Sequence, residues 1–237
     1  MSALPTAPPR PEAGEAAMIR IKERLRAGVR RPLEPLVRVL MRLHVHPHVL
    51  TAAGLLSSLA AALAFFEGGF RSGAALLALS GLCDMLDGEL ARRGAMVSTF
   101  GAFLDSLLDR LAEAVTLTGI AGFYIVNLLE LAHDPARVLA ELERGLEPRT
   151  WAVVALTAVL ALVGSFLVSY TRARAEGLGL ECRVGWFERP ERLALLIVAA
   201  AFGVGPVMPG ALLLLTVLSF ATAIQRVAHV WNSTRTP

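Results

Sequence analysis

Long uncharged stretches restrict what this sequence can fold into. The longest runs from Leu193 to Gln225, 33 residues without a charge, and three others cover residues 49–66, 114–129 and 151–171. A helix needs about 20 apolar residues to cross the hydrocarbon core of a bilayer. Because the whole chain is 55% hydrophobic and only 18% charged, the sequence predicts an all-α polytopic membrane protein rather than a soluble domain.

The predicted number of spans depends on two uncharged stretches, one shorter and one longer than a single transmembrane helix. Only residues 72–83 are uncharged between Arg71 and Asp84, so a second span has to continue through acidic residues to cross the bilayer. The longest stretch exceeds one untilted helix, and GPVMPG at residues 205–210 is expected to break it. We therefore expect six transmembrane helices.

Three regions are expected along the chain. Residues 1–17 are rich in Pro and Ala and predict a disordered tail. Residues 18–43 mix Ile, Leu and Val with Arg and Lys, which is typical of a basic amphipathic juxtamembrane helix on an anionic membrane surface. Pro32 and Pro35 are expected to divide that segment. Residues 44–237 are expected to form the six-helix transmembrane domain.

The distribution of arginines predicts the orientation of the chain. In a six-span arrangement, the arginines of residues 18–43, 92–93 and 172–192 fall on the side of the amino terminus, and the opposite loops carry few positive charges. The positive-inside rule then places both termini in the cytoplasm. We expect a multi-pass protein of the cytoplasmic membrane, with its site on the cytoplasmic side.

Four aspartates at the ends of the second and third predicted spans form the candidate site. Asp84 and Asp87 are three residues apart, and Asp105 and Asp109 are four apart, so each pair projects from one face of a helix. Carboxylates held this close usually surround a cation. Oxygen ligands without His or Cys nearby favour Mg²⁺, Mn²⁺ or Ca²⁺ over zinc.

Each aspartate, taken alone, also fits a helix-end charge paired with an arginine at the membrane interface. Taken together, they belong to a longer pattern that resembles the signature of the CDP-alcohol phosphatidyltransferase family. The matching positions are Asp84, Asp87, Gly88, Ala91, Arg92, Gly101, Asp105 and Asp109. A further motif, Pro-Asn-x-x-Thr at the start of the first span, is met in part, since PHVLT has His48 in place of Asn and keeps Thr51.

The resemblance implies a fold and a reaction. The family has six transmembrane helices after an amino-terminal juxtamembrane helix, and its members are usually homodimers. The reaction moves a phosphatidyl group from CDP-diacylglycerol, or a similar CDP-lipid, to an alcohol and releases CMP. The expected partners are therefore this lipid donor, a small polar alcohol acceptor, the lipid bilayer and a second copy of the chain, with no nucleic acid.

The resemblance also implies a role for each matching residue. The four aspartates would hold two divalent ions, typically Mg²⁺ with Mn²⁺ as the alternative, and Asp109 would also act as the general base. The residues expected to contact the CDP-lipid or make room for it are Thr51, Gly88, Ala91, Arg92 and Gly101.

The stretch SYTRARAEGLGLECRVGWFERPERL, residues 169–193, bears on the acceptor. It resembles the phosphatidylinositol-phosphate synthase branch of the family, which implies contacts to an acceptor phosphate. The residues that would make them are Arg172, Arg174, Arg189 and, near the carboxyl end, Arg226. Arginines bind phosphate through paired N–H donors that free inositol or serine does not need. Inositol phosphate is therefore the expected acceptor.

Three alternatives stay open at this point. Glycerol 3-phosphate needs arginines equally well. Positive-inside topology alone also explains basic residues in a cytoplasmic loop, and the acceptor would then be a non-phosphorylated alcohol. A membrane ion-site or transport protein could use the acidic cluster without catalysis, although the complete set of aspartates argues against this class.

Overall fold

The regular structure of this chain is helical throughout the described part. The computed structural model describes residues 32–94, 96–134, 136, 138–139, 148–182 and 184–235. The helices are α2 (Pro47–Phe66), α3 (Phe70–Arg93), α4 (Thr99–His133), α6 (Pro148–Gly177), α7 (Arg189–Ala201) and α8 (Val207–Arg235). The predicted all-α class is confirmed. The predicted tail and residues 18–31 of the basic segment lie outside the described residues.

A further helix covers residues 32–42. Its described part runs from Pro32 through Pro35 without interruption, so the prediction that Pro35 divides the segment is wrong. Val37 packs this helix against the rest of the chain, with only 1% of its surface exposed.

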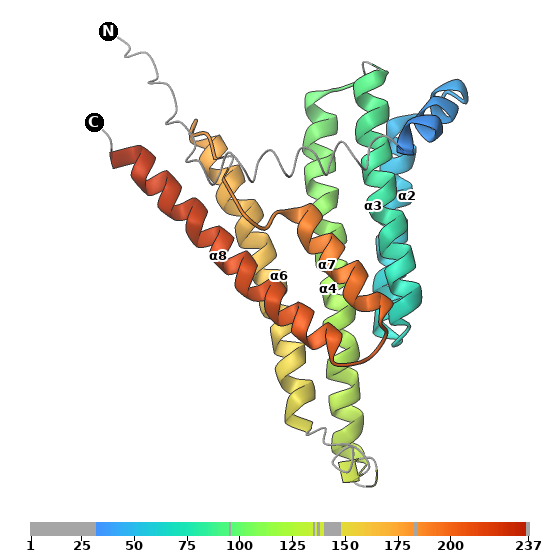
Figure 1. Ribbon diagram of the computed structural model, residues 1–237, viewed down its shortest axis with the longest axis vertical. Helices are drawn as coiled ribbons and strands as arrows, with labels where there is room; N and C mark the ends of the chain where they lie inside the picture. The colour runs from blue at the N-terminus through green and yellow to red at the C-terminus, as the bar shows by residue number, and fades with distance from the viewer. Residues whose placement is uncertain are drawn as a thin grey trace.

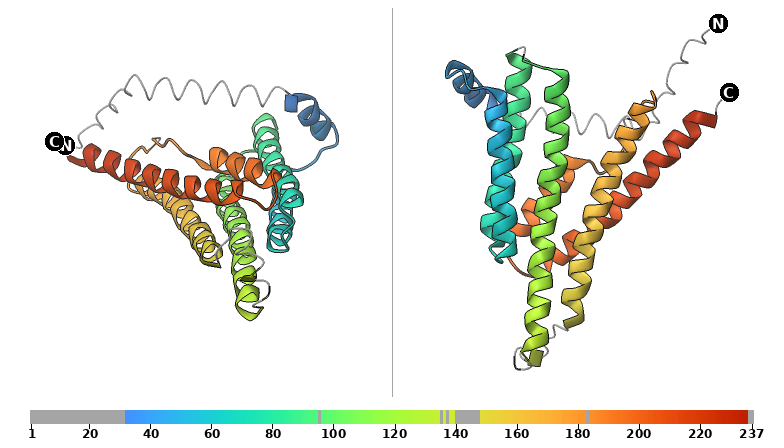
Figure 2. Two further views of the ribbon diagram at one scale, coloured as in Figure 1. Left: turned by 60° about the horizontal axis from the view of Figure 1, so that its bottom comes forward. Right: turned by 180° about the vertical axis from the view of Figure 1, so that it is seen from behind.

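The six helices from α2 to α8 form a closed ring (Figures 1 and 2). The closely packed pairs are α2–α3, α3–α7, α7–α8, α8–α6, α6–α4 and α4–α2, so each helix packs against two neighbours. Among the described residues, α4 is not closely packed against α3 or α7. In Figure 1 the ring opens towards the top, where α3 and α8 end far apart. The helices of the ring therefore diverge towards this end, which we call the open end.

Four of these helices, α2, α4, α6 and α8, are long and apolar enough to cross a membrane. Helix α3 has 24 residues, but acidic and basic side chains occupy its second half. Helix α7 has 13 residues, about 20 Å at 1.5 Å per residue, which is less than a hydrocarbon core of about 30 Å. The structure thus supports a polytopic membrane protein with at least these four candidate spans.

The predicted break in the longest uncharged stretch is confirmed, although it lies at residues 202–206 rather than across residues 205–210. Helix α7 ends at Ala201 and α8 begins at Val207. Gly203 has a φ of +83°, a left-handed conformation that glycine adopts without steric cost. The chain therefore reverses direction between two helices of the ring.

Small residues allow close contact along the ring. A Cβ added to Gly119 of α4 would lie 2.3 Å from the carbonyl oxygen of Ala62 in α2, and one added to Gly164 of α6 would lie 3.0 Å from the Cβ of Ser219 in α8. Membrane helices commonly associate through such small residues, because backbones can then approach closely. These contacts fix the spacing of α2, α4, α6 and α8.

Aromatic side chains close the ring at the end away from the opening. We call this cluster the aromatic end; it consists of Phe65, Phe70, Phe123, Tyr124 and Trp151. Ring centroids lie 5.1 Å apart for Phe70 and Phe123 and 5.6 Å apart for Tyr124 and Trp151, within the range of favourable aromatic pairs. The cluster joins α2, α3, α4 and α6.

Candidate active site

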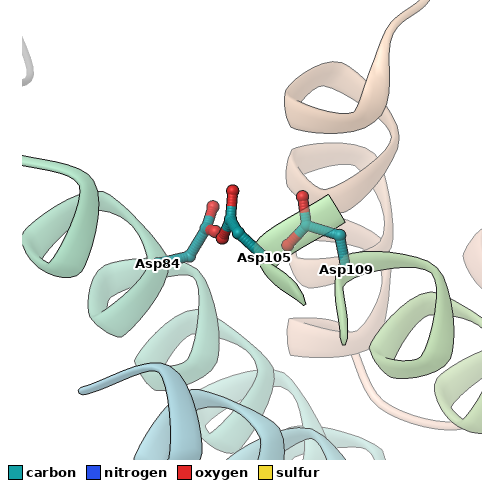
Figure 3. Close-up of side chains that lie close together, drawn as sticks. All are labelled: Asp84, Asp105 and Asp109. Atoms are coloured by element: carbon teal, nitrogen blue, oxygen red, sulfur yellow. The ribbon is translucent and has the colours of Figure 1, made fainter. Parts of the chain in front are cut away.

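Three carboxylates meet inside the open end of the ring. Asp84 comes from α3, and Asp105 and Asp109 come from successive turns of α4. One oxygen atom from each lies within 4.8 Å of those from the other two, and Figure 3 shows the three side chains close together. The convergence predicted from the spacing is therefore present for these three residues. We call them, together with Asp87 and Arg189, the acidic end.

Asp87 lies one turn further along α3 and apart from the other three. Only 6% of its surface is exposed, and it accepts a hydrogen bond from the Oγ1 of Thr51 in α2 at 2.8 Å. Both residues line the same pocket as the other aspartates. Thr51 thus orients a carboxylate, and its predicted contact with the CDP-lipid stays a prediction.

Arg189 lies directly against the carboxylate cluster. Its Nη1 is 3.0 Å from Asp84 Oδ2 and 2.8 Å from Asp109 Oδ1. Arg189 is the first residue of α7, and this start is stabilised because the Glu188 N–H donates to Glu191 Oε2 at 3.0 Å. The cap therefore places the guanidinium at the open end of the ring, where it joins α3 to α4.

A pocket surrounds these groups. The four aspartates, Thr51 and Arg189 line it together with small and apolar side chains. A concave site with a few convergent polar groups is typical of small-ligand binding. The pocket is therefore the candidate active site.

The donor set fits a hard divalent cation. Asp84, Asp105 and Asp109 offer carboxylate oxygens, the ligands that Mg²⁺ and Mn²⁺ prefer. Like charges at these distances repel one another unless a positive charge lies among them. Arg189 supplies one such charge to Asp84 and Asp109, and Asp105 is exposed towards the opening. The residues present are thus suited to hold metal on the open side of the cluster.

The other residues predicted to contact the CDP-lipid flank the pocket without lining it. Gly88, Ala91 and Arg92 occupy the last turns of α3. The guanidinium of Arg92 is exposed and lies 3.0 Å from Glu89 Oε2. A Cβ on Gly88 would lie 3.3 Å from Arg92 Nη1, so a side chain there would displace the guanidinium. Gly88 therefore makes room for Arg92.

Gly101 has a structural role that the sequence analysis missed. Its backbone N–H donates to Ser98 Oγ at 3.0 Å, which caps the amino terminus of α4. A Cβ on Gly101 would lie 2.9 Å from that oxygen. The cap fixes where α4 begins, and hence the positions of Asp105 and Asp109 along it. Ser98, three residues before Gly101, was the available signal.

The predicted acceptor arginines occupy different surroundings. Of the four, only Arg189 lines the aspartate pocket. Arg172 and Arg174 lie near the carboxyl end of α6, where Arg172 donates to Glu176 Oε1 at 2.8 Å. Arg174 is exposed. Both therefore lie beside the loop that leads into α7.

Arg226 of α8 is buried, with 2% of its surface exposed. Its Nε donates to the Val184 carbonyl at 2.8 Å, its Nη1 donates to the Val168 carbonyl, and its Nη2 lies 3.6 Å from Glu188 Oε1. These contacts tie the loop before α7 to α6 and α8. Arg226 thus supports the segment that carries Arg189, and direct contact with an acceptor stays a prediction.

A second arginine on α7 forms an ion pair that the sequence analysis did not single out. Arg192 Nε lies 2.6 Å from Glu113 Oε1, and its Nη2 lies 2.9 Å from Glu113 Oε2. The pair joins α7 to α4 one turn deeper in the ring than Arg189 and Asp109. Glu113 continues the four-residue spacing of Asp105 and Asp109, which was the signal that could have revealed it.

Known proteins are similar to this chain in both sequence and fold. The family model described as CDP-alcohol phosphatidyltransferase matches residues 44–230. The archaetidylinositol phosphate synthase of Methanothermobacter thermautotrophicus is 35% identical over 210 residues, covering 87% of this chain and 92% of that protein. The phosphatidylinositol phosphate synthase of Mycobacterium tuberculosis is 33% identical over 215 residues, covering 88% and 89%.

Crystal structures of the Mycobacterium tuberculosis phosphatidylinositol phosphate synthase have a fold similar to that of this chain. The complex with manganese and citrate superposes with a TM-score of 0.67 at 31% identity, covering 83% of this chain and 88% of that chain. The complex with CDP-DAG gives a TM-score of 0.66 at 31% identity, covering 85% and 94%. With its motif, its acidic pocket and these matches, the chain belongs to the CDP-alcohol phosphatidyltransferase family.

Proposed function

We propose that this enzyme transfers the phosphatidyl group of a CDP-diacylglycerol-type lipid to inositol phosphate and releases CMP. The observation that carries the proposal is the carboxylate cluster with Arg189 bound to two of its members. The names of the relatives support the acceptor, since they are synthases of archaetidylinositol phosphate and phosphatidylinositol phosphate. The CDP-DAG complex of the Mycobacterium tuberculosis enzyme supports the donor.

The donor side of the proposal uses the four aspartates. Asp84, Asp105 and Asp109, with Asp87 oriented by Thr51, would hold two divalent ions, Mg²⁺ or Mn²⁺. Such ions stabilise negative charge on a pyrophosphate and on a departing phosphate. The manganese complex of the Mycobacterium tuberculosis enzyme supports the use of a divalent metal. Arg92, Gly88, Ala91 and Gly101 would contact the CDP moiety, or make room for it, at the rim of the pocket.

The chemical step follows from Asp109. The acceptor hydroxyl oxygen forms a bond to the phosphatidyl phosphorus, the bond from that phosphorus to CMP breaks, and the hydroxyl proton passes to the Asp109 carboxylate. A positioned general base of this kind typically accelerates a reaction by about 10²- to 10⁴-fold. Asp109 lines the pocket and is held in place by Arg189 Nη1 at 2.8 Å.

The acceptor side uses the arginines. Arg189 donates a hydrogen bond from Nη1 to Asp84 Oδ2 and forms an ion pair with Asp109 through the same nitrogen, and its guanidinium also carries N–H donors on Nη2 and Nε. A guanidinium binds phosphate through such a pair of parallel donors. Arg172 and Arg174 would add charge at the mouth of the site, and Arg226 would reach the acceptor only through movement of the loop that it holds.

The membrane arrangement belongs to the same proposal. All six helices from α2 to α8 would be embedded as a unit of residues 44–237, with the basic segment of residues 18–43 on the cytoplasmic surface and the chain paired in a homodimer. The acidic end would then face the cytoplasm. Leu178, which is 58% exposed directly after the end of α6, tests on which side of the membrane this end lies: a Leu178→Cys variant should react with an impermeant thiol reagent only in opened cells. Labelling of intact cells would contradict this orientation.

A panel of acceptors tests the proposed reaction. Purified protein is incubated with labelled CDP-diacylglycerol, Mg²⁺ and, in separate reactions, inositol phosphate, glycerol 3-phosphate, inositol or serine. We expect CMP release with inositol phosphate. Release with another of these acceptors alone would assign a different acceptor, and no release with any of them would favour a membrane ion-site or transport protein.

A further inference from the structure

Two ion pairs form successive rungs between α4 and α7. Arg189 bonds to Asp109 at 2.8 Å, and Arg192 bonds to Glu113 at 2.6 Å. Because Asp109 and Glu113 are four residues apart on α4, and Arg189 and Arg192 are three apart on α7, each helix presents its two charges along one face. The rungs cross a gap, since α4 and α7 are not a closely packed pair within the described residues.

The two rungs differ in their access to ligands. The side chains of Arg189 and Asp109 are 23% and 19% exposed, whereas those of Arg192 and Glu113 are 1% and 11% exposed. Arg192 engages both carboxylate oxygens of Glu113 and also donates to the Phe187 carbonyl at 3.4 Å. The outer rung can therefore meet substrates, and the inner rung cannot.

A second pocket, deeper in the ring, brings Arg189 close to the inner rung. This pocket is lined by Glu113 and Arg189 together with Ser58, Ser80 and Thr116. Arg189 also lines the outer pocket with the aspartates, so its side chain lies between the aspartate cluster and Glu113. Without a partner, the Glu113 carboxylate would be a buried charge, and it would attract the nearest available guanidinium.

We propose that Arg192 neutralises Glu113 so that Arg189 stays directed towards the aspartate cluster and the acceptor phosphate. The pair is then a positioning device for the acceptor arginine. The part concerning the acceptor rests on the proposed function, while the part concerning the aspartates does not. If Arg189 turned inwards to Glu113, Asp84 and Asp109 would lose their guanidinium and would be freer to bind a divalent ion.

The variant Arg192→Met tests this inference, because it removes the charge and keeps an unbranched apolar side chain. We expect the acceptor KM to rise about tenfold or more, since Arg189 is captured by Glu113. In the absence of any substrate, the Mn²⁺ affinity, measured by electron paramagnetic resonance of the purified protein, should increase severalfold. Arg235→Met, at the far end of α8 where the arginine stacks on Trp231, is the matched control and should change neither quantity.

A second variant separates positioning from simple bracing. The double change Glu113→Gln with Arg192→Met leaves no buried charge to capture Arg189, so both the acceptor KM and the Mn²⁺ affinity should return towards wild-type values. If Arg192→Met does not fold, Arg192→Lys replaces it and, because it keeps the charge, should hold both quantities within about threefold of wild type. Thermal unfolding in detergent reports the folded fraction of each variant.

Several outcomes would overturn the inference. Unchanged Mn²⁺ affinity in folded Arg192→Met, or a double variant that departs from wild type further than the single one, would show that the pair only braces the helices. A large change in both quantities for Arg192→Lys would do the same. If the wild-type protein does not use inositol phosphate, the proposed function fails, and the Mn²⁺ measurements still decide whether Arg192 directs Arg189.

Discussion

The two ends of the helix ring are built from opposite kinds of contact. At the aromatic end, α2, α3, α4 and α6 meet through ring packing, as between Phe70 and Phe123. At the acidic end, α3, α4 and α7 meet through ion pairs, as between Arg189 and Asp84. Closely packed aromatic side chains fit together in one arrangement. A guanidinium, by contrast, can exchange one carboxylate partner for another, or for a phosphate.

The difference separates stability from chemistry within one bundle. The close contacts at Gly119 and Gly164 and the aromatic end hold the helices at fixed distances. The acidic end can then remain open, with polar groups across a gap, without loss of the overall arrangement. We therefore expect substitutions at the acidic end to change metal and substrate parameters, and substitutions at the aromatic end to change the free energy of unfolding.

Metal removal should have the largest effect. EDTA is expected to reduce CMP release to background, and Asp84→Asn should lower Mn²⁺ affinity by at least about 10- to 100-fold, the loss typical even of residues that only orient metal ligands. Electron paramagnetic resonance and CMP release measure the two quantities. Turnover that continues unchanged in EDTA would refute the assignment of the acidic end as a metal site.

Asp109→Asn should come next. Loss of the general base is expected to lower kcat by about 10²- to 10⁴-fold, while CDP-lipid binding is largely retained because Asp84, Asp87 and Asp105 still offer ligands. Asp134→Asn, beyond the opposite end of α4, is the control and should leave kcat unchanged. A kcat of Asp109→Asn close to that of wild type would assign the base to another group.

Phe70→Ala tests the other side of the comparison. Phe70 is 1% exposed, and truncation of a buried phenylalanine costs about 3–5 kcal/mol of stability. Phe66→Ala, a matched control with 48% of its side chain exposed, should cost much less. Unfolding in detergent measures both. The KM values of the folded fraction for donor and acceptor should stay at wild-type levels. A selective rise in either KM would show that the aromatic end also affects substrate binding.

The sequence predicted much of the fold because the uncharged stretches and their interruptions determine where helices begin and end. The continuation of α3 through Asp84 and the break before Val207 both followed from span length. The reach of α7 across the ring did not, because it depends on contacts between residues far apart in the chain. We expected six transmembrane helices, and the length of the uncharged stretch did not reveal that α7 has only 13 residues.

The candidate site, like the fold, could be predicted where it depends on local spacing and not where it depends on tertiary contacts. The spacing of Asp105 and Asp109 placed both on one face of a helix, and the meeting with Asp84 followed from their common depth. The pairing of Arg192 with Glu113, 79 residues away, and the burial of Arg226 followed from no local pattern. Long side chains reach several angstroms from the backbone, so their partners are set by tertiary packing rather than by spacing.

The smallest expected change tests the central claim most directly: the acidic end holds the donor through its aspartates and the acceptor phosphate through Arg189. Steady-state kinetics of Arg189→Ala, with donor and acceptor varied separately, measures both. Each lost charge-assisted bond is worth about 1.5–3 kcal/mol, so the KM for inositol phosphate should rise about tenfold or more, while the KM for the CDP-lipid does not rise. A rise in the CDP-lipid KM alone, or no kinetic effect, would contradict the account and favour a non-phosphorylated acceptor.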